Sequence, residues 1–274
     1  MSLLQSIVLG IVQGLTEFLP ISSSAHLRIV PALFGWSDPG AEFTAIIQLG
    51  TMAAVVIYFR RDLWNVVTTW FRSLTRPRLR SDLNARMGWY LIIGTIPIVI
   101  FGFLFRHQIE TGARSLYLMG VTLIVFGLLL GAADSLGSKK RTVESVSRKD
   151  AIVVGLAQAL ALIPGVSRSG ATITAGLVMG LDREAAARFS FLLSVPAIVL
   201  SGLYELTKEL GGSGSMGAGV GSVLVATIVS FIVGYAAIAF LLRWLTKHSL
   251  YIFVVYRVAL GLIVLILAGS GAIS

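Results

Sequence analysis

Long apolar runs alternate with short polar stretches along the whole 274-residue chain. Six of the runs approach the ~20 residues that an α-helix needs to cross a bilayer. They cover residues 43–59, 87–105, 116–133, 185–206, 220–242 and 250–268. The pattern predicts an all-α integral membrane protein with six transmembrane helices. A glycine-rich stretch, GGSGSMGAG at 211–219, predicts a flexible loop between two of these spans.

Two further apolar segments are interrupted by polar residues near their middle. The first, 3–19, ends at Pro20 and a serine run, and a short apolar piece follows at 27–34. The second consists of 151–163 and 171–181, which are separated by the polar stretch PGVSRSGAT. Two short helices joined by a polar turn fit a re-entrant hairpin better than a complete span. We therefore expect two re-entrant helical hairpins in addition to the six spans.

The order of one hairpin followed by three spans occurs twice, and the two halves are weakly similar. IVLGIVQGLTEFLP, from Ile7, aligns with IVVGLAQALALIPG, from Ile152, and this alignment matches Gln13 with Gln158. Because each half holds an odd number of crossings, the second half is expected to be inserted upside down relative to the first. The sequence thus predicts an inverted repeat, 1–135 and 148–274, within a single membrane domain, with the two polar breaks meeting near the midplane.

Composition excludes a soluble domain, and charge predicts an orientation. Hydrophobic residues make up 56% of the chain, charged residues 13%, and the mean hydropathy is +0.88. Sixteen of the 22 basic residues fall on one face of the predicted topology and four on the other. By the positive-inside rule, this places both termini outside a cytoplasmic (inner) membrane. The net charge of +9 is explained in this way, and it does not indicate a nucleic-acid partner.

The first hairpin carries polar residues that can support chemistry. Gln13 and Glu17 are four residues apart, so they lie on one helix face within an apolar segment. They could hold a hard divalent cation such as Mg²⁺ or Ca²⁺, with phosphate oxygens completing its coordination, or Glu17 could be a general base. A structural contact between helices is the alternative. His26 and Ser23, in the turn, are candidate nucleophiles or proton carriers, whereas serines there also serve as helix caps.

The second hairpin contains an arginine in an apolar setting, Arg168, which should therefore face a cavity or an anion. Neighbouring hydroxyls can hydrogen-bond phosphate oxygens, and a glycine lets backbone N–H groups approach a ligand. These residues are Gly165, Ser167, Ser169 and Thr172. The stretch therefore predicts a phosphate or diphosphate pocket. Arg257, with Tyr256 in the last span, is either a second anion contact or a buried partner for an acidic residue, and the structural interpretation is favoured.

The motifs QGLTEFLPISSSAH at 13–26 and PGVSRSGAT at 164–172 resemble those of the undecaprenyl-diphosphate phosphatases, the bacitracin-resistance family. The resemblance implies a membrane hydrolase that converts undecaprenyl diphosphate to the monophosphate and so recycles the lipid carrier of envelope polymers. It also implies a site that opens to the outer face of the membrane. The family's metal-binding acidic motif falls on Gln13 and Glu17, although the first position is Glu in some members.

The same resemblance assigns the catalytic histidine to His26 and a catalytic hydroxyl to Ser23. It assigns the arginine motif to Ser167, Arg168, Ser169 and Thr172. The nucleophile stays open between Ser23, His26 and water. A polyprenyl-phosphate flippase is the main alternative, because inverted repeats with broken helices also build transporters. A purely structural subunit is disfavoured by the cost of burying Glu17, His26 and Arg168. The oligomeric state stays open, with a homodimer among the alternatives.

Overall fold

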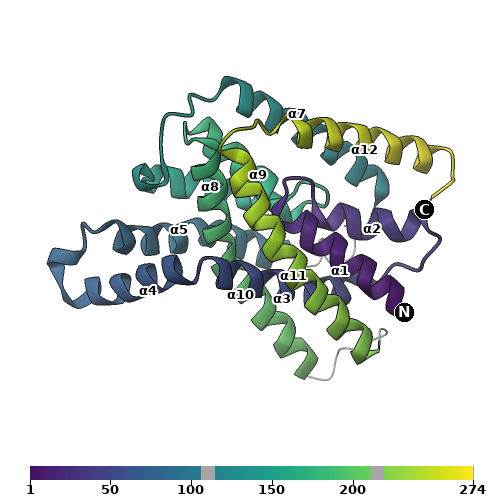
Figure 1. Cartoon of the computed structure of the whole chain (residues 1–274), viewed down its shortest axis with the longest axis horizontal. Coiled ribbons are helices and arrows are strands. Elements are labelled where there is room, and N and C mark those ends of the chain that lie inside the picture. The colour runs from purple at the N-terminus through teal and green to yellow at the C-terminus, as the bar shows by residue number, and fades with distance from the viewer. Residues whose placement is uncertain (106–114, 211–218, 274) are drawn as a thin grey trace.

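The computed structural model describes residues 1–105, 115–210 and 219–273, and these residues are almost entirely helical (Figure 1). The predicted loop at 211–219 and the basic residues Arg106 and Arg114 lie, apart from Gly219, outside the described residues. The helices of the first half are α1 (Leu3–Phe18), α2 (Ser23–Leu33), α3 (Gly40–Tyr58), α4 (Arg60–Thr75), α5 (Leu83–Leu104) and α7 (Leu116–Leu136). Those of the second half are α8 (Arg148–Ala159), α9 (Arg168–Val178), α10 (Arg183–Leu210), α11 (Val220–Leu245) and α12 (Tyr251–Gly269).

Each predicted apolar segment coincides with a helix, within a few residues at its ends. Four helices, α5, α7, α11 and α12, are long and apolar enough to cross a membrane, and the bent pair α3 and α4 can count as a fifth. These counts apply to the described part of the chain. An all-α, multi-pass membrane protein is therefore confirmed, whereas six spans with two re-entrant hairpins stay a prediction.

One helix was missed at the sequence level. No helix is predicted between the spans 43–59 and 87–105, but the first part of this basic segment forms α4, which turns by 76° from α3. The helix forms because one side of it packs on α5, where the Trp70 ring lies against Gly88. Figure 1 shows α4 beside α5 at one end of the molecule. Charged and apolar residues share this helix, so its amphipathic period is hidden by its overall basic composition.

The two halves of the chain pack into each other. Helix α1 contacts α11, where Gly10 and Gly14 allow the two backbones to approach closely, and α8 contacts α5 through Gly155 and Gly94. Helix α7 packs along α12. Thus the first helix of each hairpin is held by a helix of the other half. This exchange fits an inverted repeat, and the exact division at 1–135 and 148–274 stays a prediction.

Both termini lie at the same end of the helix array (Figure 1). The Tyr117 hydroxyl, at the start of α7, donates to the Ala268 carbonyl near the end of α12 over 2.9 Å. The Ser222 hydroxyl, at the start of α11, donates to the Met1 carbonyl over 3.3 Å. The starts of α1, α7 and α11 therefore share a side with the end of α12.

At the opposite end, in the connection between α7 and α8, the partly exposed Arg141 pairs with the buried carboxylate of Asp150. Arg141 donates two hydrogen bonds to the Asp150 carboxylate, over 2.9 and 2.6 Å, and a third to the Met179 carbonyl. The Ser147 N–H also donates to Asp150, which is fully buried. Burial alone would raise the pKa of Asp150, but the hydrogen bonds from Arg141 and Ser147 outweigh it and hold that pKa below its ordinary value.

We predict that Asp150→Asn lowers the free energy of unfolding by about 2–4 kcal/mol, because Arg141 loses its charge partner. The native pair also makes stability depend on pH. A carboxyl whose pKa is lowered by folding contributes stability above its unfolded pKa, and this contribution is lost as the pH falls through the folded value. Unfolding of detergent-purified protein, followed by circular dichroism, measures both effects.

Asp62→Asn is the matched control, because Asp62 pairs with Arg188 over 2.8 Å but both side chains are more than one-third exposed. Exposed pairs contribute little, so this variant should change stability by less than about 1 kcal/mol. Equal losses in the two variants would contradict the structural role given to Asp150.

Candidate active site

The two polar turns have nearly the same local structure. Ser22 and Ser167 both adopt positive φ angles, 77° and 72°, and each is the N-cap of an 11-residue helix, α2 or α9. Each cap hydroxyl accepts a backbone N–H three residues later, Ala25 in one turn and Gly170 in the other. Each also lies 3.2 Å from the hydroxyl of the serine two residues on. Serine caps and a sharp backbone turn thus start both short helices.

The buried Arg257 side chain of α12 joins these two turns. Its guanidinium donates to the Pro20 carbonyl over 3.1 Å in the first hairpin, and to the Gly165 and Val166 carbonyls over 3.1 and 3.0 Å in the second. Two further bonds reach Leu123 and Thr122 on α7. All five acceptors are backbone carbonyl oxygens, and none of them belongs to an acidic side chain. The favoured structural role of Arg257 is therefore supported, but the expected acidic partner was wrong, because backbone carbonyls take its place.

Two more hydrogen bonds connect the hairpins directly. The Gly165 N–H donates to the Ser24 hydroxyl over 3.3 Å, and the Ser169 hydroxyl donates to the Leu19 carbonyl over 3.2 Å. Gly165 has a φ of 86°, and a Cβ there would lie 2.0 Å from the Thr122 hydroxyl, so only glycine fits. The predicted meeting of the two polar breaks is therefore observed.

Glu17 lies at this junction and contacts both hairpins. One carboxylate oxygen, Oε2, accepts the Ser23 hydroxyl over 2.8 Å and the Gln13 amide over 3.0 Å. The other, Oε1, lies 3.4 Å from Arg168 Nη2 and 3.4 Å from the Gln48 amide. Glu17 is buried and Arg168 is 19% exposed. A hydroxyl, a carboxylate and a guanidinium are thus gathered at one place, as the motifs predicted.

His26 is held at both ring nitrogens. Nδ1 lies 2.7 Å from the Ser22 carbonyl, which can only accept, so Nδ1 carries a proton. In the neutral ring Nε2 is then the acceptor, and it lies 2.7 Å from the Tyr256 hydroxyl. The structure shows no hydrogen bond between His26 and Ser23 among the described residues. Ser23 and His26 are nevertheless three residues apart on α2, so they share a helix face.

The hydroxyls of the second motif bond mainly within the protein. Ser167 caps α9, and Ser169 reaches across to the first hairpin. Thr172 is fully buried, and its hydroxyl lies 2.6 Å from that of Ser190 on α10. Arg168 is 19% exposed, which is more than any of these three hydroxyl residues. The role of the three hydroxyls and of Gly165 in binding an anion stays a prediction.

Two side-chain oxygens at the junction are suited to bind a divalent cation. The Gln13 carbonyl oxygen, Oε1, is buried without a hydrogen-bond partner. Glu17 Oε1 has two polar contacts, with Gln48 and Arg168, and both are as long as 3.4 Å. Both are hard oxygen ligands of the kind that Mg²⁺ and Ca²⁺ prefer. No cluster of three or more acidic, histidine or cysteine ligands occurs in the described part of the chain. A cation held here would therefore need oxygens from a ligand.

Three residues of the site were missed at the sequence level. Gln48 and Thr51 extend from α3 toward Glu17 and Gln13, and Tyr256 was considered only beside Arg257. A glutamine within the apolar segment 43–59 was the available signal for Gln48, because an amide in a membrane helix needs a partner. Nothing in the sequence links Tyr256 to His26, 230 residues away.

Comparison with known proteins gives a consistent result. The model of the family described as bacitracin resistance protein BacA matches residues 6–263. A relative from Nocardioides sp. named undecaprenyl-diphosphatase is 56% identical over 99% of this chain and 98% of its own length. A second, from Thermobifida fusca and with the same name, is 54% identical over 100% of this chain and 93% of its own length. A third relative with this name, from Chloroherpeton thalassium, is 52% identical over 99% of this chain and 98% of its own length.

We predict that Arg257→Lys lowers the free energy of unfolding by about 2–4 kcal/mol, since an ammonium cannot reproduce the planar fork that reaches five carbonyls. The exposed Arg243, at the end of α11, provides a control, and Arg243→Lys should change stability by less than about 0.5 kcal/mol. Thermal unfolding in detergent compares the two. An Arg257→Lys protein as stable as the control would show that the guanidinium does not hold the hairpins together.

Proposed function

The chain belongs to the bacitracin resistance protein BacA family, and from that premise we propose that it is an undecaprenyl-diphosphatase. It hydrolyses undecaprenyl diphosphate to undecaprenyl phosphate and inorganic phosphate. This reaction recycles the lipid carrier for cell-wall synthesis and accounts for bacitracin resistance. The observation that supports the residue assignment is the contact of Ser23, Glu17 and Arg168 at the junction of the two hairpins.

Ser23 is the nucleophile in this proposal. Its hydroxyl already donates to Glu17 Oε2, so the carboxylate can take the proton as the oxygen attacks the terminal phosphorus. A bond forms between Ser23 Oγ and phosphorus, the phosphoanhydride bond breaks, and undecaprenyl phosphate leaves with the electron pair. Water then hydrolyses the phosphoserine and releases inorganic phosphate. His26, on the face of α2 shared with Ser23, and its hydrogen-bond partner Tyr256, on α12, manage the proton of this water.

Arg168 binds and orients the diphosphate. Its guanidinium lies beside Glu17 and partly exposed, so phosphate oxygens can approach it from the open side. A guanidinium matches the geometry of phosphate oxygens and offsets the charge that develops as the phosphoryl group is transferred. Ser167, Ser169, Thr172 and Gly165 position Arg168 through the cap and backbone of α9, and they form the proposed binding loop.

Gln13 Oε1 and Glu17 Oε1 would hold a divalent cation, Mg²⁺ or Ca²⁺, together with the substrate. When bound, such an ion neutralises diphosphate oxygens and stabilises the leaving phosphate. Gln13 also donates to Glu17 Oε2, and this hydrogen bond keeps that carboxylate oriented toward Ser23. The chain's own groups thus set the geometry of the attack.

The orientation belongs to the same proposal. The basic end of the molecule faces the cytoplasm, so both termini and the mouth of the site lie on the outer side of the bacterial membrane. The junction favours an enzyme over a flippase, because opening a path between the hairpins would break the bonds of Arg257 to both turns. A homodimer is also part of the proposal, and a measurement of the protein's mass in detergent tests it.

We predict that Ser23→Ala lowers kcat for phosphate release by at least about 1,000-fold, since the nucleophile is lost. The neighbouring Ser24→Ala removes a hydroxyl that contacts Gly165 and should cost less than about tenfold. Phosphate release from undecaprenyl diphosphate by detergent-purified protein measures both. If Ser23→Ala kept activity comparable to that of Ser24→Ala, water or His26 would replace Ser23 as the nucleophile.

A further inference from the structure

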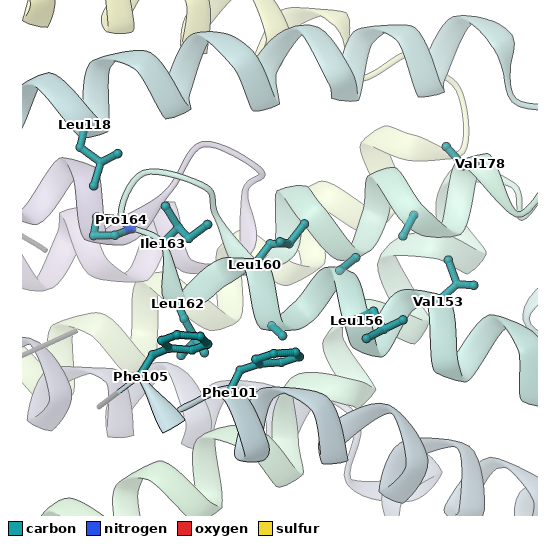
Figure 2. A pocket seen from close by; sticks show the side chains of 13 residues that line it. Phe101, Phe105, Leu118, Val153, Leu156, Leu160, Leu162, Ile163, Pro164 and Val178 are labelled. Atoms are coloured by element: carbon teal, nitrogen blue, oxygen red, sulfur yellow. The ribbon is translucent and has the colours of Figure 1, made fainter. Parts of the chain in front are cut away.

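An apolar cavity of about 980 Å³ lies on the other side of the second hairpin turn (Figure 2). Its walls come from α5, α7, α8 and α9, with Phe101 and Phe105 on one side and Leu118 on the opposite side. Every one of its lining side chains is apolar. Alanines at 157, 159 and 175 leave the space between the helices unfilled. The cavity is large enough for a ligand of considerable size.

One end of the cavity lies next to the candidate active site. Pro164 lines this end, and Gly165, the next residue, donates its N–H to the Ser24 hydroxyl. Ser24 adjoins the proposed nucleophile Ser23, and Arg168 begins α9 four residues after Pro164. Figure 2 shows Leu118, Ile163 and Pro164 at this end, and Val153 and Val178 at the other. The cavity thus leads away from the site along α8.

The cavity is accessible at the surface of the molecule. Phe105, Leu118 and Val178 are 48%, 37% and 67% exposed, and each lines the cavity. In a membrane these side chains meet lipid, so a chain already dissolved in the bilayer could enter sideways. Leu118 lies near the start of α7, which shares a side with both termini, so the proposed orientation places the end of the cavity near Leu118 and Pro164 toward the outer leaflet.

The chemistry of the walls specifies a hydrocarbon without polar atoms. Leu162 lines the cavity, and Glu17 occupies the equivalent position of the first hairpin, 145 residues earlier, as Gln13 does relative to Gln158. One hairpin therefore places a carboxylate where the other places a leucine. Since no lining side chain could orient a polar head group, the occupant must be anchored outside the cavity. Arg168, which begins α9 four residues after the lining Pro164, is a cation that can anchor a diphosphate.

We propose that this cavity, the chain groove, binds the prenyl chain of the substrate while the diphosphate lies at Glu17 and Arg168. The proposal rests on the proposed function, because it takes the lipid diphosphate as given. The groove selects substrates by length. A short prenyl chain reaches only the end near Pro164, whereas a long chain also fills the part near Val153 and Val178. Val153 is six residues before Ala159, the last residue of α8, so the groove follows α8 for about 9 Å before it reaches the turn at Pro164.

Filling the middle of the groove tests this assignment. Ala157→Phe adds a ring on a lining position, and it should raise KM for undecaprenyl diphosphate about tenfold while changing KM for geranyl diphosphate less than about twofold. Ala236→Phe is the matched control, because Ala236 is an exposed alanine on α11 outside the groove. The control should leave both KM values unchanged. Phosphate release in detergent micelles is the readout for all three proteins.

A second measurement uses the unmodified protein. An undecaprenyl diphosphate analogue with a photoreactive group in its chain should label peptides containing 101–105, 153–164 or 175–178. Labelling confined to α11 and α12, or equal KM changes for the two substrates in Ala157→Phe, would overturn the groove assignment while phosphate release by the parent continued. No phosphate release by the parent from either substrate would instead reject the proposed function.

Discussion

The buried guanidinium of Arg257 determines how the two hairpin turns face each other. Burying a charge among apolar helices costs several kcal/mol unless hydrogen bonds compensate for the lost water. Here five carbonyl oxygens do so, and they belong to both turns and to α7. Since Ser23 and Arg168 each follow a turn bound by Arg257, their separation depends on this one side chain.

The two turns share a backbone but differ in the side chains that they present. Ser22 and Ser167 cap their helices in the same way, and both residues are followed by the side chain that faces the site, Ser23 in one hairpin and Arg168 in the other. A repeated structural unit has thus been given two chemical roles. In the proposed mechanism, one turn supplies a nucleophile next to a carboxylate, and the other supplies the cation that binds the anionic substrate.

Much of this arrangement could be predicted from the sequence because apolar length and polar breaks are local signals. The helices of the apolar segments and the meeting of the two polar breaks were expected on that basis. The partners of Arg257 were not expected, because every residue has a backbone carbonyl and a carbonyl partner therefore produces no sequence pattern. Helix α4 was missed because its arginines masked its apolar face. The Tyr256 contact with His26 depends on how α12 packs, which no local pattern encodes.

Phosphate release from undecaprenyl diphosphate by the detergent-purified chain tests the central claim most directly. It should be measured with and without Mg²⁺ or Ca²⁺, beside Arg168→Gln and Glu17→Gln. The account predicts release by the parent that depends on the cation and is lost in both variants, although both remain folded and no sealed membrane is present. Absence of release by folded parent protein that binds the lipid would contradict it and would favour a transporter.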